Sequence, residues 1–343
     1  MRTMPIRPFL PPYLLERIAG SRNARQRDRA YRTLHDDQGS VPGPVLPSCR
    51  KAALDAASPC AMSIPPVIPA SCRASGCAAR GKRPAVIPPW TRPIRPGSDY
   101  ALYWEAFQRH SLDDRGMALL ATVHYGEDYE NAFWDGRQMV FGDGDGELFN
   151  RFTIALDIIA HELTHGVIQH EAALVYADQA GALNESLADV FGSLVKQHRL
   201  GQDVESADWL IGAGLFTDRV EGQALRSMAA PGTAYDDPLL GRDPQPGHMR
   251  DFVETQDDNG GVHINSGIPN RAFHHVAMAL GGHAWEEAGQ VWYDTLVDER
   301  LARNSDFAAF AKLTLDNAGR RFGTDGEVRR AVHEAWRAVG VLS

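Results

Sequence analysis

The feature that most constrains this chain is an apolar helical run that carries two histidines and a glutamate. The run reads IALDIIAHELTHGVIQHEA and spans residues 154–172. Its apolar residues surround the whole helix instead of one face, which is typical of a helix buried in the middle of a protein. Burying His161, Glu162 and His165 there is unfavourable unless a partner compensates them. The sequence therefore predicts a buried central helix whose three polar residues interact with a common partner.

Histidines four positions apart lie on one face of a helix, one turn above each other, and can hold a single ion. Glu162 follows the first of them and lies close to where a water on that ion would sit. His-Glu-x-x-His on a helix is typical of zinc sites in metalloproteases. The alternative is a pair of core histidines satisfied by hydrogen bonds. We favour the metal, because it gives the buried groups a partner.

A catalytic zinc ion needs a third protein ligand and one open position for water. The segment NESLAD offers Glu185 and Asp189, which are four positions apart and so face the same way along a helix. We expect Glu185 to bind the metal and Asp189 to accept the N–H of a ligating histidine. The alternative is a solvated acidic pair on an exposed helix, which the apolar stripe of residues 184–199 disfavours.

A third cluster of polar residues reads DDNGGVHINSG and brings His263 after a Gly-Gly turn. Asp257 and Asp258 precede the turn. A histidine backed by a carboxylate can donate a hydrogen bond to a developing oxyanion. The alternative is a turn with an incidental histidine.

The remaining pattern predicts an α+β chain that is β-rich first, then has the central helix, and is mostly helical afterwards. Short strand-type runs stand at Leu120 to Tyr125 and Gln138 to Phe141, between Gly, Asp and Asn turns. An amphipathic helical element is predicted over residues 12–35. Four later segments have helical spacing: residues 270–282, 285–301, 306–322 and 326–340.

Composition excludes several classes of partner. The 343 residues suffice for about two domains, and the formal net charge of −9 argues against nucleic acid. No apolar run reaches the ~18 residues of a membrane helix, so we expect no membrane partner. The N-terminus lacks the long apolar stretch and cleavage site of an ordinary secretory signal. We expect a protein that stays in the cytoplasm or leaves by an unusual route.

Residues 41–97 differ in composition from both flanks. Residues 41–96 hold 12 of the 21 prolines, all four cysteines and one acidic residue, Asp55. One interpretation is a disordered proline-rich linker, and the other is an out-of-frame translation that leaves both flanks intact. The predicted parts are a propeptide-like segment 1–40, the anomalous segment 41–97, a β-rich remainder 98–150, the central helix 151–170 and a helical domain 171–343.

Together the segments HELTH, GALNESLADVFG, NAFWDG, LRSM and DNGGVHINSG resemble the thermolysin family of zinc endopeptidases, in that family's order. The resemblance runs from about residue 98 to the C-terminus. The N-terminal PPYLLERIA is similar to the short propeptide of the protealysin-like branch. The resemblance implies a thermolysin-like two-domain fold with a β-rich N-terminal part and a helical C-terminal domain.

The resemblance also implies roles for individual residues. His161, His165 and Glu185 would hold one catalytic zinc ion. Glu162 would act as general base and then pass the proton to the leaving amine. Asp189 would accept the N–H of a ligating histidine. His263, oriented by Asp258 and helped by Tyr176, would stabilise the tetrahedral intermediate.

Substrate would bind as an added strand on Asn131 and the backbone of Ala132. Arg226 would hold the carbonyl of the residue after the scissile bond. An apolar pocket for the side chain of that residue is implied at Phe149, Phe152, Ile158 and Leu225. The resemblance therefore implies cleavage before a bulky hydrophobic residue.

The chain departs from the family at its double calcium site. Lys196 stands where the family has a carboxylate, and Leu210 and Ala213 replace two more. Only Asp157 and Asp208 remain. Because the lysine ammonium can substitute for a cation, we do not expect two calcium ions there.

The expected function is that of a zinc endopeptidase made as an inactive precursor. Its partners would be polypeptide substrates and its own N-terminal propeptide, and we expect a monomer, secreted by family habit. The first alternative is a catalytically dead or misfolded zinc-binding protein, because residues 41–96 do not resemble the strands expected there. The second is a partner-binding module whose N-terminal segment never leaves the cleft.

Overall fold

The computed structural model describes residues 7–38 and 101–343, and both stretches belong to one compact unit. The anomalous segment 41–97 lies outside the described residues. The proposed boundaries on either side of it therefore stay a prediction.

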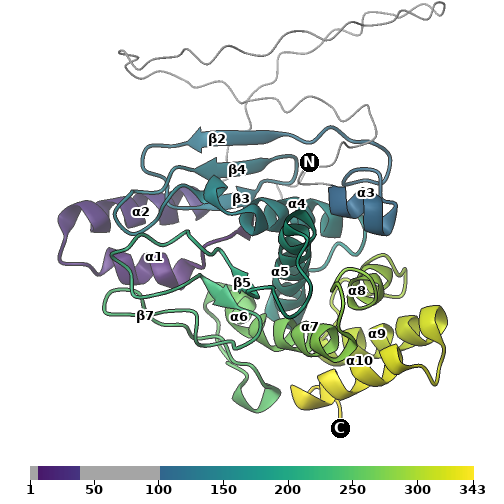
Figure 1. The fold of residues 1–343 in the computed structure, drawn as a ribbon. Coiled ribbons are helices and arrows are strands. Elements are labelled where there is room, and N and C mark those ends of the chain that lie inside the picture. The colour runs from purple at the N-terminus through teal and green to yellow at the C-terminus, as the bar shows by residue number, and fades with distance from the viewer. Residues whose placement is uncertain (1–6, 39–100) are drawn as a thin grey trace, which may run out of the picture. The chain divides into compact units, whose positions relative to one another are not determined.

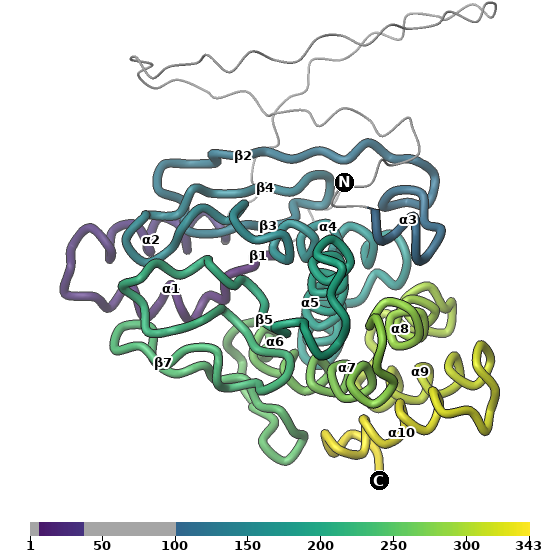
Figure 2. The backbone as a smooth tube through the Cα atoms, in the orientation of Figure 1, coloured from purple at the N-terminus to yellow at the C-terminus, as the bar shows by residue number. Residues whose placement is uncertain are grey.

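The sheet of the N-terminal half is mixed and includes a strand from the very start of the chain. Its order is β1-β3-β4-β2, with β2 and β4 parallel and the other pairs antiparallel. The strand β1 pairs Pro8 with Phe133, so it lies on the outer side of β3 (Figure 2). The predicted strand runs at Leu120 and Gln138 are confirmed as β2 and β4. The bounds are β1 Arg7–Pro8, β2 Ala121–Tyr125, β3 Ala132–Trp134 and β4 Met139–Gly142.

The predicted N-terminal helical element is two helices, α1 (Pro12–Ala19) and α2 (Ala24–Gln38). The helix α1 ends at Gly20, whose N–H bonds to the carbonyls of the last turn. The side chain of Asn23 then accepts the N–H of Arg25 and starts α2. Because these turn signals lie inside the amphipathic pattern, periodicity alone did not separate the two helices.

Two long helices form the centre of the molecule (Figure 1). They are α4 (Leu156–His170), which follows a 3₁₀ turn at Phe152–Ile154, and α5 (Asp178–Leu200). A β-carbon at Gly192 of α5 would lie 2.7 Å from the Asp157 carbonyl of α4. Only glycine permits this approach, which brings the polar faces of the two helices together.

The C-terminal half is helical, as predicted. The predicted helix 285–301 is shorter, because the Asp298 side chain accepts the N–H of Arg300 and forms a turn after α8. No helix among the described residues is both long and apolar enough to cross a membrane. The remaining elements are α3 Ala101–Phe107, β5 Leu210–Ile211, β6 Arg226–Ser227, β7 Asp236–Asp237, β8 Gly241–Arg242, η2 Met249–Asp251, α6 Asp258–Asn265, α7 Gly267–Leu280, α8 Ala288–Leu296, α9 Phe307–Phe322 and α10 Glu327–Ala338.

Candidate active site and metal centre

Helices α4 and α5 bring three ligand-type side chains to one point. His161 and His165 project from α4, and Glu185 projects from α5. Each Nε2 atom lies 3.4 Å from an oxygen of the Glu185 carboxylate. One ligand atom from each residue lies within 4.8 Å of the others, and all three residues are buried. Within the described part of the chain, this group is the one that meets these geometric conditions for a metal.

The hydrogen bonds of the two imidazoles direct their lone pairs toward that point. The Nδ1 of His161 donates to Asp189 at 2.9 Å, and that of His165 donates to Asn184 at 2.9 Å. The buried Nε2 atoms and the Glu185 Oε2 have no hydrogen-bond partner. Two imidazole nitrogens and a carboxylate are ligands that zinc takes in catalytic sites. The residues therefore fit a zinc ion.

The protonation of the histidines is set by burial and by their partners. Burial lowers the pKa of His165 to about 3, which keeps the imidazole in its metal-binding form. Burial also disfavours charge on His161, but the hydrogen bond to Asp189 and the nearby Glu185 carboxylate raise its pKa to about 9. A cation must displace the His161 proton, so metal binding releases a proton and strengthens as pH rises.

Glu162 is buried beside the metal ligands, and neither of its carboxylate oxygens has a hydrogen-bond partner. Burial raises its pKa to about 8. A carboxyl group with a pKa near neutrality can both take and return a proton. The position of Glu162 beside the metal ligands and its raised pKa therefore suit a group that takes up and returns a proton.

Helix α6 brings a second set of polar side chains, Asp258 and His263, to the same point. The backbone of α6 at Gly260 and Gly261 has φ of 87° and 73°, so this turn requires glycine. The Nδ1 of His263 donates to Asp258 at 2.6 Å. Burial disfavours charge on His263, but Asp258 and Glu185 raise its pKa to about 9. The imidazolium can therefore donate through Nε2 as well, and Tyr176 Oη lies 3.2 Å from that nitrogen.

The N-terminal segment runs through this site in an extended form. The Nε2 of His263 donates to the Pro8 carbonyl at 2.8 Å. Phe9 donates its N–H to the Ala132 carbonyl at 2.8 Å, and its own carbonyl accepts from Arg226 at 3.3 Å. The Pro8–Phe9 peptide bond is thus held on both sides by residues that the sequence assigns to the intermediate and the substrate.

Both backbone groups of the next residue, Leu10, are hydrogen-bonded to the side chain of Asn131. Its N–H donates to the Asn131 Oδ1 at 2.8 Å, and its carbonyl accepts from the Nδ2 at 3.4 Å. Arg226 is itself fixed, because both ends of its guanidinium fork bond to Asp189 at 2.8 Å. Asp189 therefore orients one histidine and the arginine together.

The side chain of Phe9 fills the apolar pocket expected from the sequence. Its ring meets the rings of Phe152 and His161 edge-on, with centroids 6.5 Å and 5.0 Å away. Arg226 lies over the ring face at 4.6 Å. Phe149 packs behind Phe152 at 6.1 Å between centroids. A β-carbon at position 212 would touch three side chains of this pocket: Leu225, Phe9 and Ile158.

An ammonium group lies at the place where the resemblance implied the family's double calcium site. The Nζ of Lys196 lies 2.9 Å from Asp157 and 2.8 Å from Asp208, and donates to the carbonyl of Leu210 at 2.6 Å. These contacts join the end of α5 to the start of α4 and to β5.

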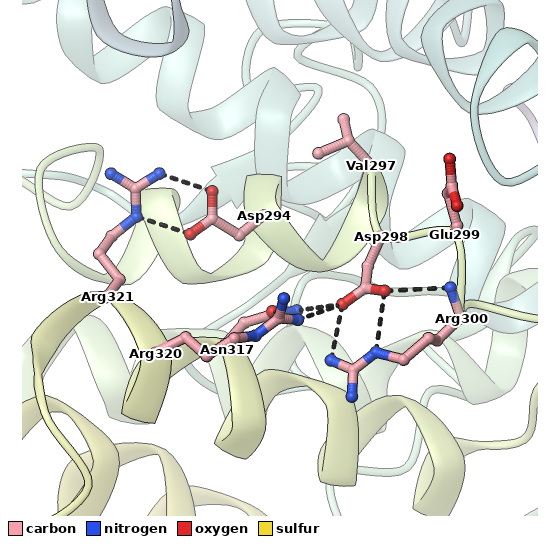
Figure 3. Close-up of a pocket in the computed structure, with 8 residues that line it drawn as sticks. All are labelled: Asp294, Val297, Asp298, Glu299, Arg300, Asn317, Arg320 and Arg321. Atoms are coloured by element: carbon pink, nitrogen blue, oxygen red, sulfur yellow. Dashed lines mark hydrogen bonds and ion pairs between the residues drawn. The ribbon is translucent and has the colours of Figure 1, made fainter.

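A surface cavity of about 660 Å³ between α8 and α9 offers a different environment (Figure 3). Five of its charged residues bond to one another: Arg321 pairs with Asp294 at 2.6 Å, and Arg300 and Arg320 pair with Asp298 at 2.8 and 2.6 Å. These five charges are therefore compensated within the cavity wall, unlike the buried ligand atoms of the metal centre.

Comparison with known proteins decides the family. The thermolysin metallopeptidase catalytic domain matches residues 95–169, and the alpha-helical domain of the same family matches residues 172–341. This chain belongs to the thermolysin family of metallopeptidases. Membership confirms the expected two-domain fold and the expected peptide hydrolase.

Relatives within the thermolysin family extend the likeness to the whole chain. An extracellular metalloprotease of Pectobacterium carotovorum is 51% identical over 351 residues, covering 99% of this chain and 98% of that protein. Thermolysin of Alicyclobacillus acidocaldarius is 37% identical over 252 residues, 71% of this chain and 44% of its own. The solved precursor of protealysin, a metalloproteinase from Serratia proteamaculans, has a TM-score of 0.77 at 46% identity and covers 98% and 99% of the two chains.

Several residues at the site were missed by sequence reasoning. Asn184 orients His165, and Asn270 donates to Asp189 at 2.9 Å. Asn184 directly precedes Glu185, so its place on the inner face of α5 was a usable signal. Gly212 had no such signal, because only tertiary contacts bring it to the cleft. The propeptide resemblance predicted that the N-terminal segment interacts with the enzyme, but no local pattern indicated that Arg7–Leu10 makes the contacts.

Proposed function

We propose that this chain is the precursor of a zinc endopeptidase that cleaves before bulky hydrophobic residues. One observation carries the proposal. The unpartnered Nε2 atoms of His161 and His165 and the Glu185 carboxylate converge beside Glu162, and a peptide strand lies across them. A metal ligand set, a general base and a bound peptide in one buried place suit peptide hydrolysis.

His161, His165 and Glu185 would hold the zinc. When bound, zinc supplies positive charge that polarises a peptide carbonyl and makes water more acidic. Glu162 would take a proton from the attacking water while the water oxygen bonds to the carbonyl carbon. The C–N bond then breaks, and Glu162 returns the proton to the leaving nitrogen. His263 donates to the carbonyl oxygen as negative charge develops there, held by Asp258.

The preference for a bulky hydrophobic residue is supported by the position of Phe9. Its ring contacts the pocket residues, and Ala132 accepts the N–H of Phe9. Arg226 and Asn131 hold the backbone on the C-terminal side of Phe9. A substrate strand that made the same hydrogen bonds would place the side chain after the scissile bond in this pocket.

The same contacts support the role of the N-terminal segment as an inhibitory propeptide. The segment occupies the backbone hydrogen bonds that a substrate strand needs, so the two cannot bind together. Segment 1–40 would therefore have to leave before the enzyme acts on other chains. The structural likeness to the precursor of protealysin points in the same direction.

We further propose that the former double calcium site binds no calcium pair. A lysine ammonium already supplies positive charge to Asp157 and Asp208. A divalent ion at the same place would be repelled by Lys196 and would lack the carboxylates absent from positions 210 and 213. Activity outside the cell is proposed from the extracellular relative. That the enzyme acts as a monomer stays an expectation from the sequence. The relatives do not favour the dead zinc-binding alternative.

Casein hydrolysis tests the proposal. The full-length chain is first allowed to process itself, and activity is then measured with and without 1,10-phenanthroline. We expect the chelator to abolish activity, and Glu162→Gln to lower kcat at least about a hundredfold with zinc content unchanged. Glu254→Gln, at an exposed glutamate, is the control. Activity that survives both treatments would refute the zinc mechanism.

A further inference from the structure

Helix α2 contacts the loop before β3 and the loop after β4, away from the metal centre. One arginine of α2, Arg29, meets three carboxylates of the catalytic domain there. Its Nη2 lies 2.9 Å from Asp145 and 3.1 Å from Glu147, and its Nε lies 3.5 Å from Glu130. The Arg29 side chain is 9% exposed. All ion pairs made to these three carboxylates by the described residues come from Arg29.

The loop after β4 holds the Asp145 carboxylate in place by backbone hydrogen bonds. The Oδ1 of Asp145 accepts the N–H groups of residues 147, 148 and 149 at 2.8 to 2.9 Å. This loop leaves only Oδ2 free, and Oδ2 faces Arg29. A fixed fork of N–H donors can serve carboxylates on two sides at once, which a lysine ammonium on a flexible stem does less well.

Glu130 gives the independent indication that a cation belongs here. It is fully buried, and neither carboxylate oxygen has a hydrogen-bond partner. Burial raises its pKa to about 8, Asp145 acts in the same direction, and Arg29 opposes both. A nearby cation stabilises the charged form of a carboxyl group that is buried in this way, and Arg29 supplies that cation. Its neighbour Asn131 holds Leu10, so the contact lies next to the occupied cleft.

We propose that Glu130, Asp145 and Glu147 form a guanidinium-binding site on the catalytic domain, that Arg29 is its ligand in the precursor, and that this site keeps the N-terminal segment docked. The proposal rests on the proposed inhibitory role of that segment. Loss of Arg29 leaves three carboxylates close together with no cation between them. The docked form is then disfavoured relative to one in which α2 leaves and water reaches the carboxylates.

The test uses the full chain with Glu162→Gln, so that the segment cannot be cut. Hydrogen exchange is followed for residues 24–38, and residues 307–322 of α9 serve as the internal folding reference. We expect Arg29→Gln to speed exchange in α2 at least about tenfold and Arg29→Lys to lie in between. Arg32→Gln, at an exposed arginine of the same helix, should match the parent. The α9 reference should not change in any variant.

A second measurement isolates the pair. If Arg29 acts through Glu147, the effects of Arg29→Gln and Glu147→Gln will not add in the double variant. Additive effects, equal exchange in the Arg29 and Arg32 variants, or no change with Arg29→Gln would each overturn the proposal. With Glu162 restored, Arg29→Gln should also shorten the lag before casein hydrolysis. If no variant ever hydrolyses casein, the proposed function fails, while the exchange data still decide the binding site.

Discussion

At the scale of single residues, the buried charges of this enzyme are compensated in two different ways. The proposed metal ligands, His161, His165 and Glu185, leave lone pairs unpartnered, which a cation from solution would compensate. Lys196 instead brings its own cation to Asp157, which is fully buried, and to Asp208. The proposed metal centre can support chemistry, because a bound ion has an open position for water or substrate. The Lys196 ammonium has no such position, so its ion pairs contribute only to the stability of the fold.

Replacing Lys196 should therefore destabilise the protein. In Lys196→Met the Asp157 carboxylate stays buried without its partner, and we expect the free energy of unfolding to fall by about 3–5 kcal/mol. Urea unfolding of the Glu162→Gln chain measures this, with Lys312→Met at an exposed lysine as the control. EGTA should not change the stability of the parent. Equal stabilities of the two lysine variants would contradict this account.

At the scale of elements, the strand β1 and the helix α2 secure the N-terminal segment at separate places. The strand contributes backbone hydrogen bonds, and the Phe9 ring follows directly after it, while the helix contributes charged contacts. Helix α1 between them buries Leu14, Leu15 and Ile18 in the same hydrophobic core as residues of the catalytic domain. Release of the segment therefore requires several contacts to break, and each can be altered alone.

Removing the Phe9 ring should weaken latency. Phe9→Ala empties the apolar pocket, which costs about 3 kcal/mol and corresponds to roughly a hundredfold weaker docking. We expect the freshly purified full-length chain to hydrolyse a short peptide substrate before any chain cleavage is detectable. Tyr31→Ala, at an aromatic side chain that is 58% exposed, should stay latent like the parent. Latency of both variants would argue against the pocket as an anchor.

Docking of α2 should also depend on pH through Asp37. Its carboxylate accepts from Asn131 at 2.9 Å and from Tyr129, and burial raises its pKa to about 6. The docked form then binds the proton more tightly than the released form. The contribution is fully present below about pH 4 and is lost as pH rises through about 6.

Amide protection factors of α2 between pH 4 and 8, in the Glu162→Gln chain, measure this dependence. We expect protection to fall across this range in the parent. Asp37→Asn cannot ionise, so its loss of protection between pH 4 and 6 should be smaller. An identical pH profile in both chains would show that Asp37 does not contribute.

At the scale of the whole molecule, the proposed metal centre joins the two halves of the enzyme. The proposed ligands come from α4 and α5, and the polar groups around them come from α6 and from β6. A ligand that binds only the folded form stabilises it by mass action. Zinc should therefore stabilise the whole catalytic domain.

Removing zinc should lower the melting temperature. At free zinc about a thousand times above Kd the stabilisation is about 4 kcal/mol, which for a chain of this length corresponds to roughly 6 °C. Calorimetry of the Glu162→Gln chain, before and after chelation, measures the change, and one equivalent of zinc should restore it. His161→Ala should show no such restoration. A melting temperature that ignores chelator and zinc would contradict the assigned ligands.

The sequence by itself determined the parts that depend on local spacing. The four-residue spacing of His161 and His165 predicted their shared face, and NESLAD predicted the inner face of α5. The strands near residues 121 and 139 and the helices near the C-terminus followed from periodicity of apolar side chains. Such patterns are readable because a helix or strand repeats its geometry every few residues.

Only the tertiary structure decided what crosses the cleft. Leu10 and Asn131 are 121 positions apart, and Pro8 and His263 are 255 apart. A short segment such as RPFL has no period that predicts its distant partner, and its hydrogen bonds are made by backbone groups that every residue carries. The occupied cleft and the Arg29 contact therefore depend on packing between elements, which local sequence patterns do not determine.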